Sequence, residues 1–220
     1  MSCDAVIITA AGSSKRWADQ RKKEYASMDG RPVLSRAVEP FLEISPALQL
    51  IITLPPADIP MVRHMLRPQI ASERIHLVAG GNTRQESVRL GLESLQEQPP
   101  QVVLIHDGAR PWIDGALISR VLEGTRKWGA CIPVLDASEA PKRIGPSGLI
   151  LEDLPREQFK LAQTPQGFLY DRILEAHQRV KGSSHLFLDD AEVYALCWSG
   201  VFTVPGDRKN RKITYQEDLP

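Results

Sequence analysis

Short apolar runs alternate along the chain with longer segments in which apolar residues recur at helical spacing. The runs have the length of strands, are rich in valine, isoleucine and leucine, and cover residues 5–9, 48–54, 75–79, 102–106, 129–134 and 201–205. The segments with helical periodicity cover residues 33–41, 58–66, 84–95, 117–128 and 169–180. This pattern predicts strands and helices in alternation.

Apolar strands that are separated by helices are typical of a parallel sheet built from β-α-β units. Because such a sheet is covered by helices on both faces, we predict an α/β fold, a Rossmann-like three-layer sandwich with a mostly parallel sheet. A chain of 220 residues is long enough to bury such a core. We find no internal repeat, and we predict a single domain over residues 1–220.

Residues 136–158 interrupt this alternation, because they lack helical periodicity and carry a Gly-Pro-Ser-Gly turn at 145–148. Turn residues between two short extended pieces predict a β-hairpin that leaves the main body, over about residues 137–157. Such an excursion is either a floppy loop or an arm that pairs with a second copy of the chain. Its apolar residues favour a dimerisation arm; they are Ile144, Leu149, Ile150 and Leu151.

The charge of the chain is balanced, with 27 basic and 27 acidic residues. We therefore predict no non-specific binding to nucleic acid or to an anionic membrane. The short basic run at 208–212 is a candidate functional patch, with a solvated face as the alternative. The cysteines, Cys3, Cys131 and Cys197, form no C-x-x-C pair, which favours reduced thiols. No apolar stretch approaches the roughly 18 residues of a membrane span, and the first residues do not resemble a signal peptide. We expect a soluble, cytoplasmic protein.

The loop after the first predicted strand combines small residues with nearby cations. The sequence AAGSS at 10–14 is followed by Lys15 and Arg16, and then by Lys22 and Lys23. Small side chains let backbone N–H groups approach an anion, and neighbouring cations add charge-assisted bonds to phosphate oxygens. The further glycines of a dinucleotide-binding loop and of a P-loop are missing. The loop predicts a polyphosphate site of another kind; the alternative is an ordinary strand and turn with surface lysines.

Other loops with polar residues and glycine also follow predicted strands. Paired glycines open segment 80–87, His106-Asp107 and Arg110 follow the strand at 102–106, and Asp136 follows the strand at 129–134. In an open parallel sheet, ligands bind outside the carboxyl ends of the strands, so these loops share one rim. The alternative for each loop taken alone is a capped helix or a solvated loop. Asp107 and Arg110 could likewise form a simple ion pair. Together the loops predict a ligand site.

The order of motifs along the chain resembles the 2-C-methyl-D-erythritol 4-phosphate cytidylyltransferases, a family of the non-mevalonate pathway of isoprenoid biosynthesis. The resemblance spans nearly the whole chain and rests on AAGSSKRW, RKKEY, GRPVLSRAV, AGGNTRQESV, HDGARP, IPVLDAS, AQTPQGF, DDAEV and NRKIT. It implies a nucleotidyltransferase domain that transfers the cytidylyl group of CTP to methylerythritol phosphate and releases pyrophosphate. It also implies a homodimer with exchanged arms.

The functional residues of the family are carried over where the motifs match. The resemblance implies that Arg16 and Lys23 contact the triphosphate and stabilise the transition state. The implied contacts with CTP are Ala10, Ala11, Gly12, Gly80, Gly81, Asn82 and Ser87. The implied contacts with the polyol phosphate are Asp107, Arg110, Arg156, Thr164 and Lys212. Of these, Arg156 and Thr164 are expected to act in the site of the partner subunit.

Some positions depart from the family pattern and leave alternatives open. Arg21 and Lys22 precede Lys23 where the family usually has proline, so Lys22 is an alternative functional lysine. Asn82 stands where an acid is common, and the segment around Ser138 differs from that of the family. The change at Ser138 keeps a pentitol-phosphate cytidylyltransferase, such as one using ribitol 5-phosphate, as an alternative. A catalytically silent nucleotide-binding module is the third interpretation.

The expected chemistry suits these residue types without the analogy. The substrate phosphate is already an anion, so its attack on the α-phosphorus of CTP needs no strong general base. Catalysis is then positioning and the stabilisation of negative charge by lysine, arginine and Mg²⁺. Mg²⁺ is the expected cofactor, and because it binds mainly through phosphates and water, we expect no metal site in the protein. The pair Asp189-Asp190 is expected to cap a helix over 192–196.

Overall fold

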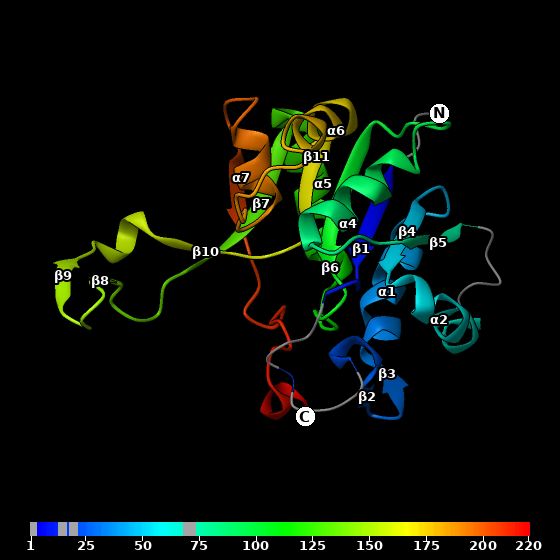
Figure 1. The fold of residues 1–220 in the computed structure, drawn as a ribbon, viewed down its shortest axis with the longest axis horizontal. Coiled ribbons are helices and arrows are strands. Elements are labelled where there is room, and N and C mark those ends of the chain that lie inside the picture. Colours follow the sequence, from blue (N-terminus) through cyan, green and yellow to red (C-terminus); the bar gives the residue numbers. More distant parts are fainter. Residues whose placement is uncertain (1–3, 13–16, 18–21, 68–73) are drawn as a thin grey trace.

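A computed structural model describes residues 4–12, 17, 22–67 and 74–220 of the protein. An eight-stranded sheet forms its centre (Figure 1). The strands are β1 (Ala5–Thr9), β4 (Gln49–Leu54), β5 (Ile75–Ala79), β6 (Val102–Asp107), β7 (Ala130–Asp136), β10 (Lys160–Ala162), β11 (Gln166–Leu169) and β12 (Phe202–Pro205). Their order is β10-β7-β11-β6-β1-β4-β5, and β12 also pairs with β7.

The sheet is mostly parallel, as predicted. Strands β6, β1, β4 and β5 pair in parallel, and so do β7 and β12. The two strands that the sequence analysis did not predict, β10 and β11, are the antiparallel ones. Their sequences, KLA and QGFL, are too short and too mixed to form a recognisable apolar run. Packing between β6 and β7 decides the conformation of β11.

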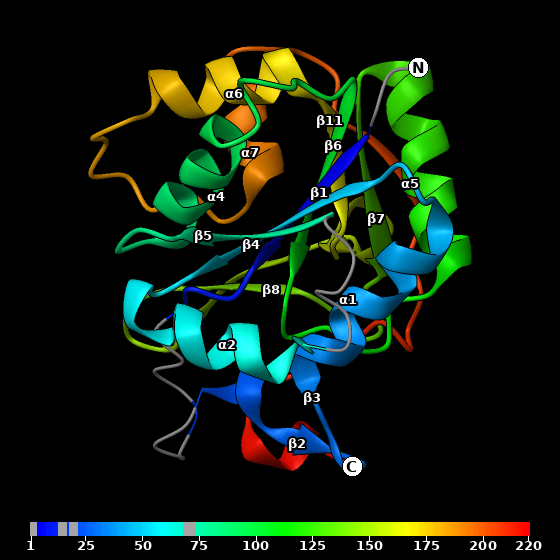
Figure 2. The same cartoon turned by 90° about the vertical axis from the view of Figure 1, so that its right-hand side faces the viewer.

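Helices cover both faces of the sheet, which confirms the three-layer prediction. They are α1 (Val33–Ile44), α2 (Ile59–Met65), α4 (Arg84–Glu93), α5 (Gly115–Trp128), α6 (Tyr170–Arg179) and α7 (Asp190–Ala195). Figure 2 shows α4, α6 and α7 on one side of the sheet and α1 and α5 on the other. The predicted bounds differ from the observed ones by at most three residues at either end.

The two faces of β1 explain why its sequence is apolar throughout. Val6 and Ile8 belong to the core under α1 and α5, whereas Ala5 and Ile7 belong to the core under α4 and α6. Successive side chains of a strand point to opposite faces, so a strand buried on both faces needs an unbroken apolar run.

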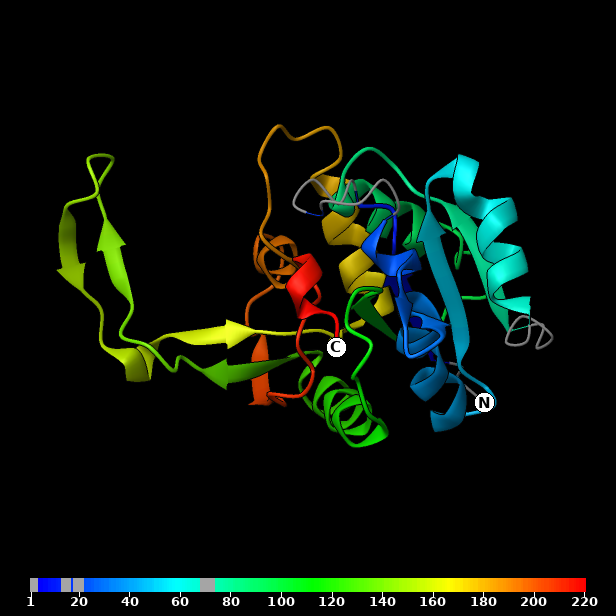
Figure 3. The same ribbon diagram turned by 90° about the horizontal axis from the view of Figure 1, so that it is seen from below.

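A β-hairpin projects from the sheet where the alternation of elements breaks down (Figures 1 and 3). It consists of β8 (Lys142–Ile144) and β9 (Ile150–Asp153), which pair antiparallel. Gly148 lies in the turn with φ of 83°, a conformation that favours glycine. The apolar side chains of the hairpin are exposed, as expected of an arm; they are Ile144, Leu149, Ile150 and Leu151. Its role in dimerisation stays a prediction.

No helix within the described residues is long and apolar enough to cross a lipid bilayer.

Candidate functional site

Asp107 is the last residue of β6 and lies at the carboxyl end of the sheet. It stands opposite Thr9, the last residue of β1. The Gly108 N–H donates to the Thr9 carbonyl at 3.0 Å, so the loops after β6 and β1 start side by side. The prediction that polar loops share this rim is therefore met by Asp107 and by the loop that begins at Ala10.

Three cations surround the Asp107 carboxylate, which is only 6 % exposed. Lys212 Nζ lies 2.8 Å from Asp107 Oδ2, and Arg110 Nε lies 3.4 Å from the same oxygen. Arg84 Nε lies 3.4 Å from Asp107 Oδ1. Burial alone would raise the pKa of Asp107, but the charges of Lys212, Arg84 and Arg110 hold it well below its usual range. The carboxylate is ionised, and the cluster keeps an excess of positive charge.

A buried chain of hydrogen bonds connects the Asp107 backbone to Thr164, His106 and Arg110. The Asp107 N–H donates to Thr164 Oγ1 at 3.1 Å, and the Thr164 hydroxyl donates to His106 Nδ1 at 3.1 Å. His106 Nε2 donates to the Arg110 carbonyl at 3.3 Å, so the network assigns the neutral tautomer with the proton on Nε2. Burial lowers the pKa of His106 to about 3, which keeps this ring neutral. Thr164, expected in the partner's site, is thus engaged within its own subunit.

The segment that carries Lys212 is fixed at the same rim by Asn210. Arg110 Nη1 donates to the Asn210 carbonyl at 2.8 Å, and Asn210 Nδ2 donates to the Thr164 carbonyl at 2.7 Å. Asn210 is completely buried. These contacts explain how a lysine from a late, polar stretch of sequence reaches Asp107 in β6.

The two loops that are predicted to hold CTP touch each other at Gly80. A Cβ added to Gly80 would lie 2.6 Å from Ala11 Cβ and 2.9 Å from Ser87 Oγ, too close for any real side chain. Glycine at position 80 therefore lets the loop after β5 pack against the loop after β1. A Cβ added to Gly12, in contrast, would meet no atom of the residues that the structure describes within 4 Å. Among these residues, Gly12 borders open space at the rim.

Side chains of α4 hold the rest of the loop after β5. The Gly81 N–H donates to Ser87 Oγ at 3.1 Å, and the Asn82 N–H donates to Glu86 Oε2 at 2.8 Å. Thr83 caps α4 by accepting from the Glu86 N–H at 3.0 Å. The structure thus brings Gly80, Gly81, Asn82 and Ser87 together, and Ser87 acts there by shaping the loop.

Lys22 lies next to Asp58, the residue directly before α2. Its Nζ lies 3.7 Å from Asp58 Oδ2, and the same carboxylate oxygen accepts from Tyr25 Oη at 2.9 Å. Lys22 is therefore already part of an ion pair with a neighbouring element.

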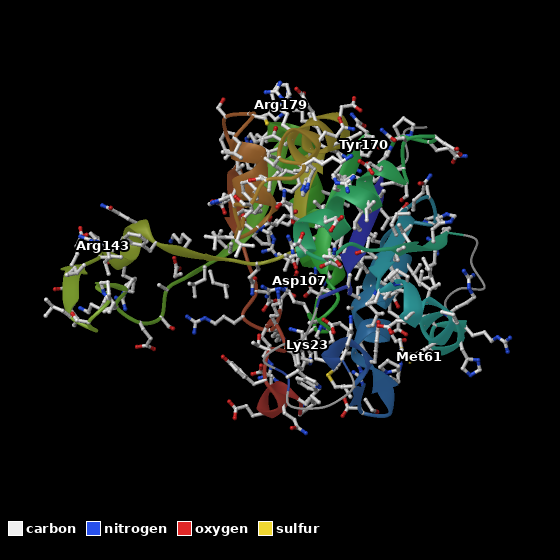
Figure 4. The ribbon with its side chains drawn as sticks, in the orientation of Figure 1. Lys23, Met61, Asp107, Arg143, Tyr170 and Arg179 are labelled. Atoms are coloured by element: carbon white, nitrogen blue, oxygen red, sulfur yellow. The ribbon has the colours of Figure 1, made fainter. Side chains whose placement is uncertain are left out.

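Lys23 is 9 % exposed and lies close to the C-terminal segment. Backbone N–H groups lower the pKa of Asp218, and the charge of Lys23 adds to this shift. Figure 4 shows Lys23 and Asp107 at the same end of the sheet, with Tyr170 at the opposite end. Arg16, the other predicted triphosphate contact, lies outside the described residues; its neighbour Trp17 packs with Ile213, next to Lys212.

Arg156 lies at the base of the arm and lines a pocket with a volume of about 470 Å³. Lys160 and Arg208 add two further cations to its lining, and Lys160 is paired with Asp136. Arg156 Nη1 donates to the Ser138 carbonyl at 3.3 Å. Within one described subunit, Asp107 and Lys212 do not line this pocket. The structure therefore brings most predicted polyol-phosphate contacts together but not Arg156.

Similarity to one protein family extends over nearly the entire chain. The sequence model of 2-C-methyl-D-erythritol 4-phosphate cytidylyltransferase matches residues 5–220. The chain belongs to this family. The resemblance of its motifs is thereby confirmed.

Curated relatives from this family are longer than this chain. A bifunctional enzyme IspD/IspF of Rhodopseudomonas palustris is 39 % identical over 219 residues, which are 98 % of this chain and 54 % of the relative. The bifunctional enzyme IspD/IspF of Rhodospirillum rubrum is 38 % identical over 225 residues, with 98 % of this chain and 55 % of the relative covered. The chain thus spans about half the length of these relatives.

Solved structures of the family share the fold over the whole chain. The 4-diphosphocytidyl-2C-methyl-D-erythritol synthase of Anaerococcus prevotii has a TM-score of 0.86 and 26 % identity, covering 99 % of this chain and 95 % of that one. The 2-C-methyl-D-erythritol 4-phosphate cytidylyltransferase of Thermus thermophilus has a TM-score of 0.77 and 29 % identity, covering 100 % and 96 %.

Sequence reasoning missed several residues that build the site of this family member. Arg84 was not proposed, although it follows the glycine loop directly and opens α4. Asp190 was interpreted as part of a helix cap, a role that Asp189 alone fills by accepting from the Glu192 N–H at 3.0 Å. Asp190 instead pairs with Arg84. The sequence alone gives no signal for this contact, because the burial of Asp190 and its distance from Arg84 depend on how α4 and α7 pack.

Proposed function

We propose that this protein transfers the cytidylyl group of CTP to the phosphate of 2-C-methyl-D-erythritol 4-phosphate and releases pyrophosphate. The observation that carries the proposal is the cation cluster at the end of β6, where Lys212, Arg84 and Arg110 meet around Asp107. It lies beside two loops whose glycines allow close backbone approach. Membership of the cytidylyltransferase family supports the same activity.

The two phosphorylated molecules would occupy neighbouring parts of this rim. The loops at 10–12 and 80–87 would hold CTP, with the triphosphate over the open side of Gly12 and towards Lys23. Arg16 would join Lys23 at the triphosphate. Lys212 and Asp107 would hold the polyol phosphate, because an ammonium group suits its phosphate and a carboxylate suits its hydroxyl groups.

The reaction is a displacement at phosphorus. An oxygen of the methylerythritol phosphate forms a new bond to the α-phosphorus of CTP, and the bond between that phosphorus and the bridging oxygen breaks. Pyrophosphate leaves with the electron pair. Lys23, Arg16 and Lys212 would stabilise the negative charge that grows on the surrounding oxygens. His106 is buried and neutral, so its role is to orient Thr164 and Asp107 rather than to take a proton.

We propose that Mg²⁺ enters bound to the triphosphate. In the described residues, no three histidine, cysteine, aspartate or glutamate side chains are grouped to hold a metal ion. The Asp107 carboxylate is already surrounded by cations. Mg²⁺ on phosphate oxygens and water would supply further charge neutralisation. The protein's own part is to bind the nucleotide that carries it.

We propose that two copies of the chain exchange their arms. Exposed apolar side chains on β8 and β9 support this, because a two-stranded hairpin is marginal alone and gains stability by packing. Arg156, at the base of the arm, would then meet the Asp107 cluster of the other subunit. In a dimer with twofold symmetry, each arm would make the same contacts with the other subunit.

We also propose a cytoplasmic location. Cys131 and Cys197 carry free thiols, and burial raises the pKa of Cys131 to about 11, which keeps it protonated. Fractionation of the source cells with antibody detection would test this location; recovery in a membrane or secreted fraction would contradict it.

The activity is tested by incubating the purified protein with CTP, Mg²⁺ and methylerythritol phosphate. Pyrophosphate release is measured, and phosphorus NMR identifies the cytidine diphosphate ester. Ribitol 5-phosphate is assayed in parallel, and a higher kcat/KM with it would replace the proposed substrate. CTP binding in calorimetry without any pyrophosphate release would instead indicate a silent nucleotide-binding module.

A further inference from the structure

Arg84 is held between two carboxylates that come from different parts of the fold. Its Nε lies 3.4 Å from Asp107 Oδ1, and its Nη2 lies 2.7 Å from Asp190 Oδ2. Arg84 is the first residue of α4, directly after the loop at 80–83, and Asp190 is the first residue of α7. Asp190, which is outside the proposed substrate contacts, is therefore the nearer of the two carboxylates.

Asp190 is itself fixed by neighbours on two further elements, α6 and β11. It is 1 % exposed, and its Oδ1 accepts from His177 Nε2 at 3.2 Å. Its backbone N–H donates to Gln166 Oε1 at 3.1 Å, and Gln166 Nε2 donates to Asp189 Oδ2 at 2.8 Å. A buried carboxylate is costly unless it is paired, so these contacts mark a position that the fold defines closely.

The balance of charge around Asp107 depends on this arrangement. With Asp190 present, the guanidinium of Arg84 is shared between two carboxylates, and Asp107 Oδ2 remains in contact with Lys212. Without the charge of Asp190, Asp107 would be the nearest carboxylate left to Arg84. The guanidinium would move towards Asp107 and compete with Lys212 for it.

We propose that Asp190 is a positioning residue for the transfer reaction: it holds Arg84 at a fixed distance from Asp107 and so leaves Asp107 and Lys212 available to the polyol phosphate. His177 and Gln166 keep the Asp190 carboxylate in place for this task. The inference rests on the proposed cytidylyl transfer and adds a buried group that touches neither substrate.

The test replaces Asp190 by asparagine, which keeps its size and removes its charge. We expect Asp190→Asn to raise KM for methylerythritol phosphate about tenfold, the scale of one weakened contact to a charged group. KM for CTP should stay within about twofold, because the loops at 10–12 and 80–83 keep their backbone contacts. Asp171→Asn is the matched control: it removes the charge of an exposed aspartate in the first turn of α6, and both KM values should match the wild type.

A second pair of variants separates positioning from packing. In an Arg84→Gln background, Asp190→Asn should add no further increase in KM for the polyol phosphate, because its effect passes through Arg84. Melting temperatures are measured for all variants. If Asp190→Asn lowers the melting temperature but leaves both KM values unchanged, Asp190 has only a packing role and the inference is wrong.

An NMR readout keeps this test independent of turnover. The Arg84 Nε–H resonance should shift in Asp190→Asn and not in Asp171→Asn, because the Asp190 carboxylate contacts the guanidinium whereas Asp171 is exposed on α6. If the wild type releases no pyrophosphate, the proposed function fails. The positioning role is then judged on this resonance alone, and an unshifted resonance would overturn it.

Discussion

Lys212 and Asp107 are 105 positions apart in the chain, yet Lys212 Nζ lies 2.8 Å from Asp107 Oδ2. Asp107 is buried, whereas the side chain of Lys212 is 36 % exposed. Because Arg84 and Arg110 also contact Asp107, Lys212 is free to turn to an incoming phosphate without leaving a buried carboxylate unpaired. The pair therefore holds a cation ready at the rim of the site.

The first prediction concerns this lysine. Lys212→Met keeps the aliphatic stem and removes the charge, so kcat/KM for methylerythritol phosphate should fall by about 10²–10³, the effect of removing one transition-state donor. The melting temperature should change little, because Asp107 keeps its two arginine partners. Lys209→Met, in the same basic run, is the matched control and should retain activity. Wild-type kcat/KM in Lys212→Met would contradict the assignment.

The second prediction distinguishes the adjacent lysines 22 and 23. Lys23→Met should lower kcat by about 10²–10³ if its ammonium group contacts the triphosphate. Lys22→Met should change kcat by less than about threefold, since Lys22 forms a part-exposed ion pair with Asp58. Steady-state kinetics on both variants decide the question. The reverse order of effects would assign the functional role to Lys22.

The third prediction compares two glycines of the proposed CTP loops. Gly80→Ala should lower stability by about 1–3 kcal/mol and weaken CTP binding, because its Cβ would collide with Ala11 and displace the loop. Gly12→Ala should leave stability unchanged, since its Cβ would meet no atom of the described part of the chain within 4 Å. The affinity of the Gly12→Ala variant for CTP should nevertheless fall if the triphosphate occupies the space next to Gly12. Calorimetry and thermal melting measure both effects, and unchanged affinity in Gly12→Ala would move the triphosphate elsewhere.

The regular part of the fold was predictable because burial on both faces leaves a strong signal in sequence. Strand β1 and helix α1 begin at the predicted residues, since apolar runs and helical periodicity are set locally. Strand β11 was not predictable in this way. Its residues Gln166 and Gly167 have no preference for strands. They are extended because β6 pairs with both of them and β7 pairs with Gly167 from the other side.

The site was predictable at strand ends and less so elsewhere. Asp107 and Gly80 follow apolar runs, so the topology of a parallel sheet places them on the rim. Asp190 and His177 come from helices on one face of the sheet, and no local pattern links them to Arg84. Contacts of this kind depend on how α4, α6 and α7 pack together, which the periodicity of each helix does not specify.

The fourth prediction tests whether Arg156 acts across a dimer. Arg156→Glu alone and Arg16→Ala alone should each be nearly inactive. If Arg156 serves the partner's site, mixed dimers of the two variants contain one intact site. An equal mixture should then recover about a quarter of wild-type activity, because half of the dimers are mixed and each has one working site of two. Arg143→Glu, on the arm and paired with Glu152, is the control and should stay active. No recovery at any mixing ratio would place Arg156 in the site of its own subunit.

The fifth prediction concerns acid stability and His106. Burial lowers the pKa of His106 to about 3, whereas an unfolded histidine titrates near 6.5. Between these values the unfolded chain binds a proton that the folded protein does not, so the free energy of unfolding falls as the pH falls through this range. The slope from one such group is at most about 1.4 kcal/mol per pH unit.

The variant His106→Asn removes this proton while its side-chain oxygen replaces Nδ1 as the acceptor for Thr164. We expect the variant to be less stable than the wild type at pH 7, because the bond from Nε2 to the Arg110 carbonyl is lost. Between pH 6.5 and pH 4 the two stabilities should converge, since only the wild type loses the contribution of His106. Asp107 does not disturb this window, because its carboxylate is ionised in the folded protein and titrates in the unfolded chain only near pH 4 and below. Urea unfolding at several pH values measures the convergence, with His64→Asn on the exposed side of α2 as the matched control. Parallel stability curves for His106→Asn and the wild type would show that His106 is protonated in the folded protein, and the tautomer assigned to the Thr164–His106 network would be wrong.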